Sequence, residues 1–207
     1  MNRLQLGVFA SGRGSNFSAI LDKIIQNELH AEIKLLVTNN KNAGVIKTAL
    51  THKIPFVVIS RSMFKNREDF VEKMIMVLKE HKVTFIALAG YMKKIPPELI
   101  AEFRNRITNI HPALLPSFGG KGMYGHYVHE NILKRGCKVT GVTIHVVDDR
   151  YDHGPIVAQR CVAVQEDDTV ESLAKRVLEV EHQIYPEVLQ LFAEDRVVVQ
   201  GEIARIK

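Results

Sequence analysis

The strongest constraint on the fold is a regular alternation between short apolar runs and segments in which apolar residues have helical spacing. The expected strands are Leu4–Ala10, Ile33–Thr38, Phe56–Ile59, Phe85–Ala89 and Ile107–Ile110. The expected helices between them are residues 17–27, 44–53, 67–81 and 97–103. Apolar strands joined by helices are typical of a parallel sheet with helices on both faces. The sequence therefore predicts an α/β, Rossmann-like fold with a mostly parallel, twisted sheet.

The later part of the chain departs from this alternation. Three elements are expected there: a helix over 126–135 and strands over 138–147 and 156–163. The polar connection "DDRYDHG" between the two strands predicts an antiparallel C-terminal strand pair. A long helix should begin near Asp168, with Asp168 and Glu171 as its cap and acidic first turn. Pro186 is expected to kink or restart this helix.

Length and composition indicate one soluble domain. The 207 residues contain 46% hydrophobic and 25% charged residues, with no repeat or linker. No apolar stretch approaches the roughly 20 residues of a membrane span, and the first strand is too short for a secretory signal. Cys137 and Cys161 form no C-x-x-C motif, which argues against a disulfide framework or a zinc site. We predict a cytoplasmic protein that binds no membrane.

The charge balance is basic, with a formal net charge of +5 and a pI near 9.2. Basic residues never run beyond two together, so no block of like charge indicates nucleic acid. Small anionic ligands fit this balance at least as well, and charge alone leaves both classes of ligand open.

The stretch "FASGRGSN" leads directly from a strand into a helix. Glycines permit a tight turn there, and the backbone N–H groups at the helix N-terminus favour an anion. The motif lacks the third glycine of the dinucleotide fingerprint, because Phe17 occupies that position. One phosphate monoester is the favoured ligand, and a plain tight turn is the alternative. The candidate phosphate-binding residues are Gly12, Arg13, Gly14, Ser15 and Asn16.

The stretch "NIHPALLPS" places Asn109 and His111 two positions apart at the end of an expected strand. Residues two apart in a strand face the same side, and the prolines on either side of "ALL" restrict the loop that follows. A carboxamide donor beside an imidazole can stabilise an oxyanion and deliver a proton. A purely structural histidine is the alternative.

Two acidic residues, Asp152 and Glu181, are further candidates for the functional site. The carboxylate of Asp152 would orient His111 and favour its charged form if its loop folds back over that residue, although a solvated turn is the default. Glu181 lies on the apolar stripe of the last helix, where a carboxylate must be paired or must meet a cationic ligand.

A metal site is a weaker alternative. His126 and His129 have i, i+3 spacing, and His111, His145 and Asp152 could join them. The chain contains no H-E-x-x-H motif, so we predict no metal.

Five motifs together resemble a known family. "FASGRGSN", "LAGYMKKI", "NIHPALLPSF", "GVTIHVVDDRYDHGP" and "EHQIYP" occur in the order found in phosphoribosylglycinamide formyltransferase, a folate-dependent formyltransferase. The resemblance covers essentially the whole chain. It implies transfer of the formyl group of 10-formyltetrahydrofolate, as cosubstrate, to the amine of glycinamide ribonucleotide in purine biosynthesis.

The resemblance also implies roles for matching residues. Asn109, His111 and Asp152 would be catalytic, and Glu181 would contact the glycinamide substrate. The folate-binding residues would be Arg67, Met92, Lys93, Lys94, Ile95, Asn109, Asp148 and Asp149. A cis peptide is expected at Leu115-Pro116. One domain over 1–207 would comprise a phosphate-binding half, about 1–100, and a catalytic and folate-binding half, about 101–207.

Rival functions share parts of this pattern. A formyltetrahydrofolate deformylase would use the same catalytic trio, but it is expected to carry an additional N-terminal domain. Methionyl-tRNA formyltransferase is expected to carry an additional C-terminal β-domain. A non-catalytic phosphate- or nucleotide-binding module explains the glycine loop but not the trio. We expect small-molecule substrates, no nucleic acid, and a monomer or homodimer.

Overall fold

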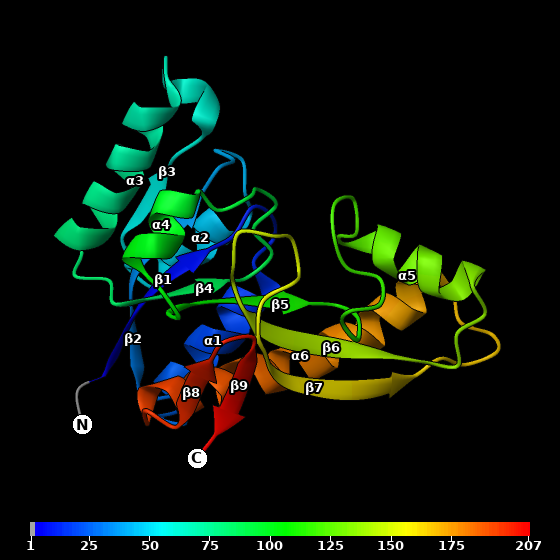
Figure 1. The fold of residues 1–207 in the computed structure, drawn as a ribbon. Coiled ribbons are helices and arrows are strands. Elements are labelled where there is room, and N and C mark those ends of the chain that lie inside the picture. Colours follow the sequence, from blue (N-terminus) through cyan, green and yellow to red (C-terminus); the bar gives the residue numbers. More distant parts are fainter. Residues whose placement is uncertain (1–2) are drawn as a thin grey trace. The chain divides into compact units, whose positions relative to one another are not determined.

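The computed structural model describes residues 3–207, which form two compact units (Figure 1). The first unit ends at Thr108, and the second runs from Asn109 to Lys207. Seven strands have the order β3-β2-β1-β4-β5-β6-β7, and a separate two-stranded sheet contains β8 and β9. The mostly parallel sheet with helices and a late antiparallel pair confirms the predicted fold class.

The first unit alternates strands and helices as predicted. Its elements are β1 (Leu4–Phe9), α1 (Ser15–Ile25), β2 (Ala31–Thr38), α2 (Val45–Thr51), β3 (Phe56–Val58), the 3-10 turn η1 (Arg61–Met63), α3 (Arg67–Glu80), β4 (Phe85–Leu88), α4 (Pro97–Glu102) and the start of β5 (Ile107–His111). The strand β1 pairs in parallel with β2 and β4, and β2 pairs in parallel with β3. Leu6, Val8 and Phe9 of β1 are fully buried, as expected of a central strand covered on both faces.

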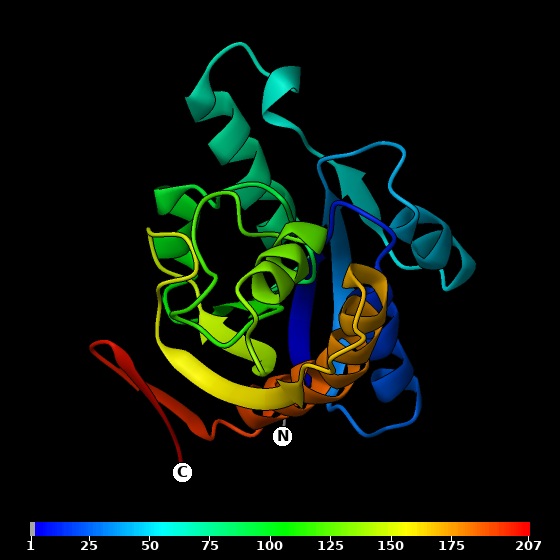
Figure 2. The same ribbon diagram turned by 90° about the vertical axis from the view of Figure 1, so that its right-hand side faces the viewer.

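The second unit contains an antiparallel pair and a long helix. Its elements after β5 are α5 (His126–Lys134), β6 (Val139–Val146), β7 (Ile156–Ala163), α6 (Val170–Ala193), β8 (Val197–Gln200) and β9 (Ile203–Ile206). The strands β6 and β7 are antiparallel and change register between Ile144 and His145. The helix α6 packs against both strands, and α5 packs against α6 (Figure 2).

The start of α6 differs from the prediction. Thr169, not Asp168, is the N-cap, and its side chain accepts a hydrogen bond from the Ser172 backbone N–H. The carboxylate of Asp168 instead pairs with Arg176 at 2.7 Å and 2.8 Å. This pairing lowers the pKa of Asp168 far below its usual range. Pro186 does not restart the helix, which is assigned continuously from Val170 to Ala193.

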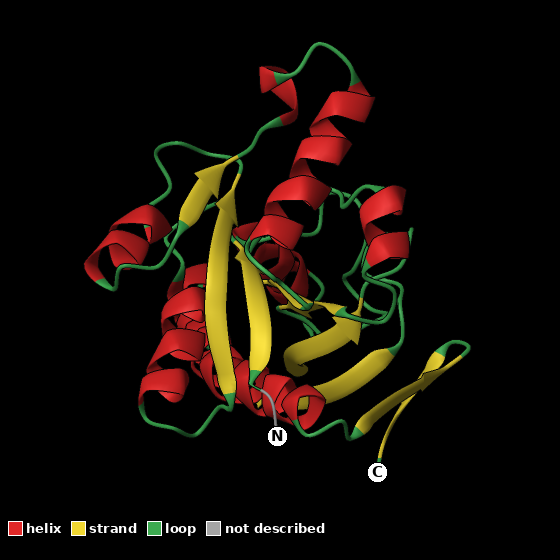
Figure 3. Cartoon of the chain, turned by 90° about the vertical axis from the view of Figure 1, so that its left-hand side faces the viewer, coloured by secondary structure: helices red, strands yellow, loops and turns green. Residues whose placement is uncertain are grey.

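Two small elements were not predicted, namely the turn η1 and the hairpin of β8 and β9. Figure 3 shows the hairpin as a ribbon of two strands at the C-terminal end of the chain. Each of its strands has only four residues, too few for the alternating pattern to stand out in the sequence. Within residues 3–207, no helix is both long and apolar enough to cross a membrane.

Candidate active site

The glycine loop of the first unit connects β1 to α1. Gly14 is the N-cap of α1 and has a left-handed φ of 83°. A Cβ atom at Gly14 would lie 2.4 Å from Cγ2 of Val45, so this position requires glycine. The first N–H groups of a helix have no partner within the helix, and they favour a bound anion. The loop therefore has the local structure that the sequence predicted for an anion site.

Ser11 connects the glycine loop to the segment that follows β4. Its Oγ donates to Asn39 Oδ1 at 2.5 Å and accepts from the Met92 backbone N–H at 2.9 Å. The Ser11 backbone N–H also donates to the carbonyl of Gly90 at 3.0 Å. Residues 90–92 thus lie beside the glycine loop, as expected when the carboxyl ends of neighbouring parallel strands meet at one edge.

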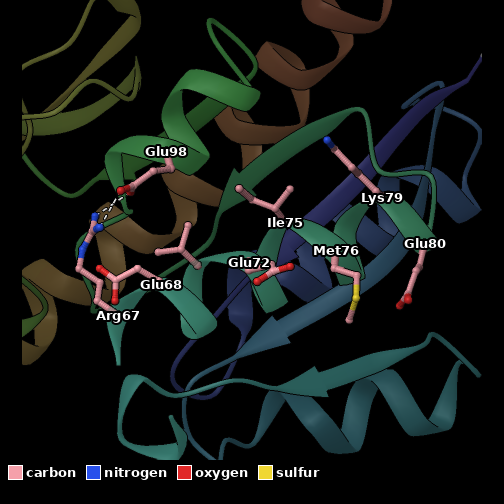
Figure 4. A pocket seen from close by; sticks show the side chains of 9 residues that line it. Arg67, Glu68, Glu72, Ile75, Met76, Lys79, Glu80 and Glu98 are labelled. Atoms are coloured by element: carbon pink, nitrogen blue, oxygen red, sulfur yellow. Dashed lines mark hydrogen bonds and ion pairs between the residues drawn. The ribbon is translucent and has the colours of Figure 1, made fainter. Parts of the chain in front are cut away.

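The predicted folate residues of the first unit have different environments. Met92, Lys93 and Lys94 are exposed, whereas Ile95 is buried. Arg67 donates two hydrogen bonds to Glu98, at 2.6 Å and 2.7 Å, next to a hollow of about 660 Å³ along α3 (Figure 4). Both partners are about half exposed, so this ion pair contributes little to stability.

The second unit brings Asn109, His111 and Asp152 together. Asn109 Nδ2 donates to Asp152 Oδ1 at 3.4 Å. His111 Nδ1 lies 3.7 Å from Asp152 Oδ2. Asn109 and His111 stand at the end of β5, and the loop after β6 supplies Asp152. The loop therefore folds back over His111, which is the alternative that the sequence left open beside a solvated turn.

The charge of Asp152 is stabilised by its neighbours. Burial alone would raise the pKa of Asp152, but the nearby His145 and His111 rings and the Gly120 N–H together lower it below its ordinary value. The Gly120 N–H donates to Asp152 Oδ2 at 2.9 Å. Asp152 is consequently a carboxylate at neutral pH.

Two of the buried histidines of this region, His111 and His129, favour the neutral form. Burial lowers the pKa of His111, although the Asp152 charge and the carbonyl of Phe118 oppose this effect. Burial and the proximity of His111 lower the pKa of His129 to about 4. Asp152 thus acts on His111 in the predicted direction, but burial outweighs it in this state.

His145 belongs to the same cluster, although its sequence position indicated only a candidate ligand of the metal alternative. Asn109 Nδ2 donates to His145 Nε2 at 3.1 Å, and His145 Nδ1 donates to the Val146 carbonyl at 3.0 Å. The available signal was the pair Thr143 and His145, two polar residues with strand spacing in the otherwise apolar run over 142–147.

Thr143 and Gln159 hold the proline loop in place. Thr143 Oγ1 donates to the Ala113 carbonyl at 2.7 Å and accepts from the Leu115 N–H at 3.0 Å. Gln159 Nε2 donates to the Leu115 carbonyl at 2.9 Å. The expected cis peptide at Leu115-Pro116 is confirmed.

Asp148, Asp149 and Glu181, the other predicted site residues of the second unit, have their own environments. Asp148 pairs with His153 at 2.6 Å and accepts from the Arg150 N–H. Asp149 is exposed. Glu181 is 8% exposed on the buried stripe of α6, as its helical position predicted.

The metal alternative gains no support from the side-chain arrangement. Over residues 3–207, no group of three or more His, Cys, Asp or Glu side chains is arranged to hold a metal ion. His126 instead lies against the ring of Tyr127, with the ring centroids 4.0 Å apart.

Comparison with known proteins identifies the family. The model of the family described as "Formyl transferase" matches residues 4–189. The chain belongs to the formyl transferase family. A phosphoribosylglycinamide formyltransferase of Bacillus subtilis (strain 168) is 38% identical over 186 residues, which are 90% of this chain and 93% of that protein.

Two further family members extend the comparison. The chloroplastic phosphoribosylglycinamide formyltransferase of Vigna unguiculata is 43% identical over 96% of this chain, but this chain spans only 64% of that relative. The crystal structure of glycinamide ribonucleotide transformylase 1 from Symbiobacterium toebii has a TM-score of 0.93 and 35% identity, covering 99% of this chain and 94% of that chain.

Proposed function

We propose that this chain is a phosphoribosylglycinamide formyltransferase. It transfers the formyl group of 10-formyltetrahydrofolate to the amine of glycinamide ribonucleotide, which gives N-formylglycinamide ribonucleotide and tetrahydrofolate in purine biosynthesis. The observation that most supports this proposal is the convergence of Asn109, His111 and Asp152 in a member of the formyl transferase family.

The chemistry requires one new bond and one broken bond. The amine nitrogen of the ribonucleotide attacks the formyl carbon, and the carbonyl oxygen becomes an oxyanion. The bond between this carbon and N10 of the folate then breaks, and N10 gains the proton that the amine has lost. The enzyme must therefore stabilise an oxyanion and move one proton.

His111 suits the proton transfer. Its lowered pKa leaves it neutral before reaction, so it can accept the proton of the attacking amine. The carboxylate of Asp152, 3.7 Å away, then stabilises the imidazolium until the proton passes to N10. The charged ring also stabilises the neighbouring oxyanion.

The side-chain amide of Asn109 is suited to donating a hydrogen bond to the oxyanion. Its Nδ2 group already donates to His145 and, over 3.4 Å, more weakly to Asp152. The developing oxyanion is a stronger acceptor, so the weaker of these bonds can be exchanged for one to the substrate. His145 keeps the Nδ2 group of Asn109 oriented throughout.

The remaining site residues are assigned to binding. The loop from Gly12 to Asn16 binds the ribonucleotide phosphate, which agrees with its position at the N-terminus of α1. The buried carboxylate of Glu181 binds the glycinamide part of the substrate. The folate cosubstrate is assigned to Arg67, Met92, Lys93, Lys94, Ile95, Asn109, Asp148 and Asp149. We propose a cytoplasmic enzyme, monomeric or homodimeric, that acts on small molecules and binds neither nucleic acid nor membrane.

A direct assay tests this function. Purified protein is mixed with 10-formyltetrahydrofolate, and tetrahydrofolate release is followed by absorbance with and without glycinamide ribonucleotide. Release that depends on the ribonucleotide supports the transferase. Equal release in its absence indicates a deformylase, and no release by folded protein leaves only a binding module.

A further inference from the structure

The backbone of residues 118–120 contacts both members of the His111–Asp152 pair. The carbonyl of Phe118 accepts a hydrogen bond from His111 Nε2 at 2.8 Å. Two residues later, the N–H of Gly120 donates to Asp152 Oδ2 at 2.9 Å. The same short segment therefore meets the proposed proton acceptor and its carboxylate partner.

We propose that residues 118–120 form a backbone clamp that makes Nδ1 the only ring atom of His111 that takes up and releases a proton during formyl transfer. In this inference the clamp is a positioning element, and Phe118, Gly119 and Gly120 are positioning residues. The inference deepens the proposed function and rests on it, because it specifies the atom through which His111 acts.

The chemistry of the two hydrogen bonds supports this assignment. A carbonyl oxygen can only accept, so Nε2 of His111 must carry a hydrogen in both the neutral and the charged ring. The lone pair of the neutral ring then lies on Nδ1. The 3.7 Å separation between Nδ1 and Asp152 Oδ2 exceeds a hydrogen bond. Asp152 thus acts on Nδ1 through its charge and leaves the lone pair to a substrate proton.

The clamp has the local geometry of a constrained segment. Phe118 has a φ of 55°, a left-handed conformation that bulky residues rarely adopt. A Cβ atom at Gly119 would lie 2.5 Å from Cδ2 of Leu115 and 3.2 Å from Cβ of Asp152. A side chain at position 119 must displace the end of the Leu115 side chain and shift Asp152 or the backbone by a few tenths of an ångström, which strains the clamp.

Opening the clamp also has a defined electrostatic effect. Three titratable side chains act on His111 or are affected by it: Asp152 from the loop after β6, His145 from β6, and His129 from α5. Asp152 and the Phe118 carbonyl favour the charged ring, while burial and His145 disfavour it. Loss of the carbonyl therefore lowers the pKa of His111 further.

The test is a ¹⁵N NMR measurement of the histidine rings in the full-length protein, with His111→Gln to assign the signals of residue 111. In the wild type we expect neutral His111 to carry its hydrogen on Nε2. In Gly119→Ala we expect a mixture of ring forms, a titration of His111 at lower pH, a several-fold loss of kcat and a smaller change in KM. Ser117→Ala, an exposed change in the same loop, is the matched control and should retain the wild-type ring form and pH profile.

The possible results distinguish failure of the clamp proposal from failure of the proposed enzyme activity. An active wild type whose neutral His111 carries its hydrogen on Nδ1 overturns the clamp and leaves the transferase standing. Gly119→Ala with an unchanged ring form and pH profile also overturns it. If Gly119→Ala does not fold, the wild-type ring form decides the question. If the wild type releases no tetrahydrofolate, the proposed function fails, and the proton-transfer role of Nδ1 fails with it.

Discussion

The proposed phosphate loop of the first unit and the proposed catalytic cluster of the second unit are built in different ways. Gly12 to Asn16 are consecutive, and the groups proposed to bind the phosphate are mainly backbone N–H groups at the start of α1. The cluster joins Asn109 and Asp152, which are 43 positions apart, and its groups are side chains. A backbone site depends on the path of the chain, whereas a side-chain site depends on residue identity. Substitutions should therefore affect stability and binding at the first site and turnover at the second.

The largest effect is expected from His111→Ala. The variant removes the proposed proton acceptor, so kcat should fall on the order of 10²–10⁴-fold while KM for both substrates changes little. Steady-state kinetics with the two substrates measure this split. An unchanged kcat would remove His111 from the mechanism.

Asp152→Asn should have the next largest effect, with a loss in kcat on the order of 10²-fold. The amide can still accept from the Gly120 N–H, but the negative charge that favours the imidazolium is lost. The pKa of His111 should move further below its ordinary value. An NMR titration of His111 measures this shift, and a pKa that moved upward would contradict the role of the Asp152 charge in stabilising the imidazolium.

Gly14→Ala tests the backbone site. The added Cβ atom would meet Val45 at 2.4 Å in a left-handed residue, so the free energy of unfolding should fall by about 2–3 kcal/mol and KM for the ribonucleotide should rise. Urea denaturation and kinetics measure the two effects. Gly12→Ala is the matched control for stability, because its Cβ atom would have no neighbour within 4 Å. Equal stability of the two variants would show that Gly14 does not limit the loop.

The smallest effect is expected from His129, because its burial makes the free energy of unfolding depend on pH. The pKa of His129 is lowered to about 4, so the unfolded chain binds a proton below about pH 6.5 before the folded protein does. The free energy of unfolding should therefore fall by about 2 kcal/mol, because of this residue, as the pH falls from 8 to 5.

His129→Phe isolates this contribution. The Nδ1 atom of His129 is buried without a hydrogen-bond partner, so an apolar ring removes the titration without breaking a bond at that atom. His111 titrates in the same direction and remains present in both proteins. Urea denaturation at pH 8 and pH 5 should show a smaller loss in the variant, and an equal loss would assign the acid sensitivity elsewhere.

Local patterns were sufficient for most of the fold. Each strand and α-helix through α6 lies where its apolar spacing predicted, because burial of one face requires that spacing. The cap of α6 was misplaced by one residue, since Asp168 and Thr169 are both good caps. In the folded chain Thr169 forms a capping box with Ser172, and Asp168 pairs with Arg176. The hairpin of β8 and β9 was missed because its strands are short.

The sequence by itself indicated the α/β fold, the anion loop at Gly14, and the shared orientation of Asn109 and His111, because each depends on residues close together in the chain. Only the tertiary structure brought His145 and the backbone of residues 118–120 to this pair, and made burial the dominant influence on the pKa of His111. The physical reason is that desolvation and long-range hydrogen bonds depend on which distant segments pack together, and no spacing of neighbouring residues encodes that packing directly.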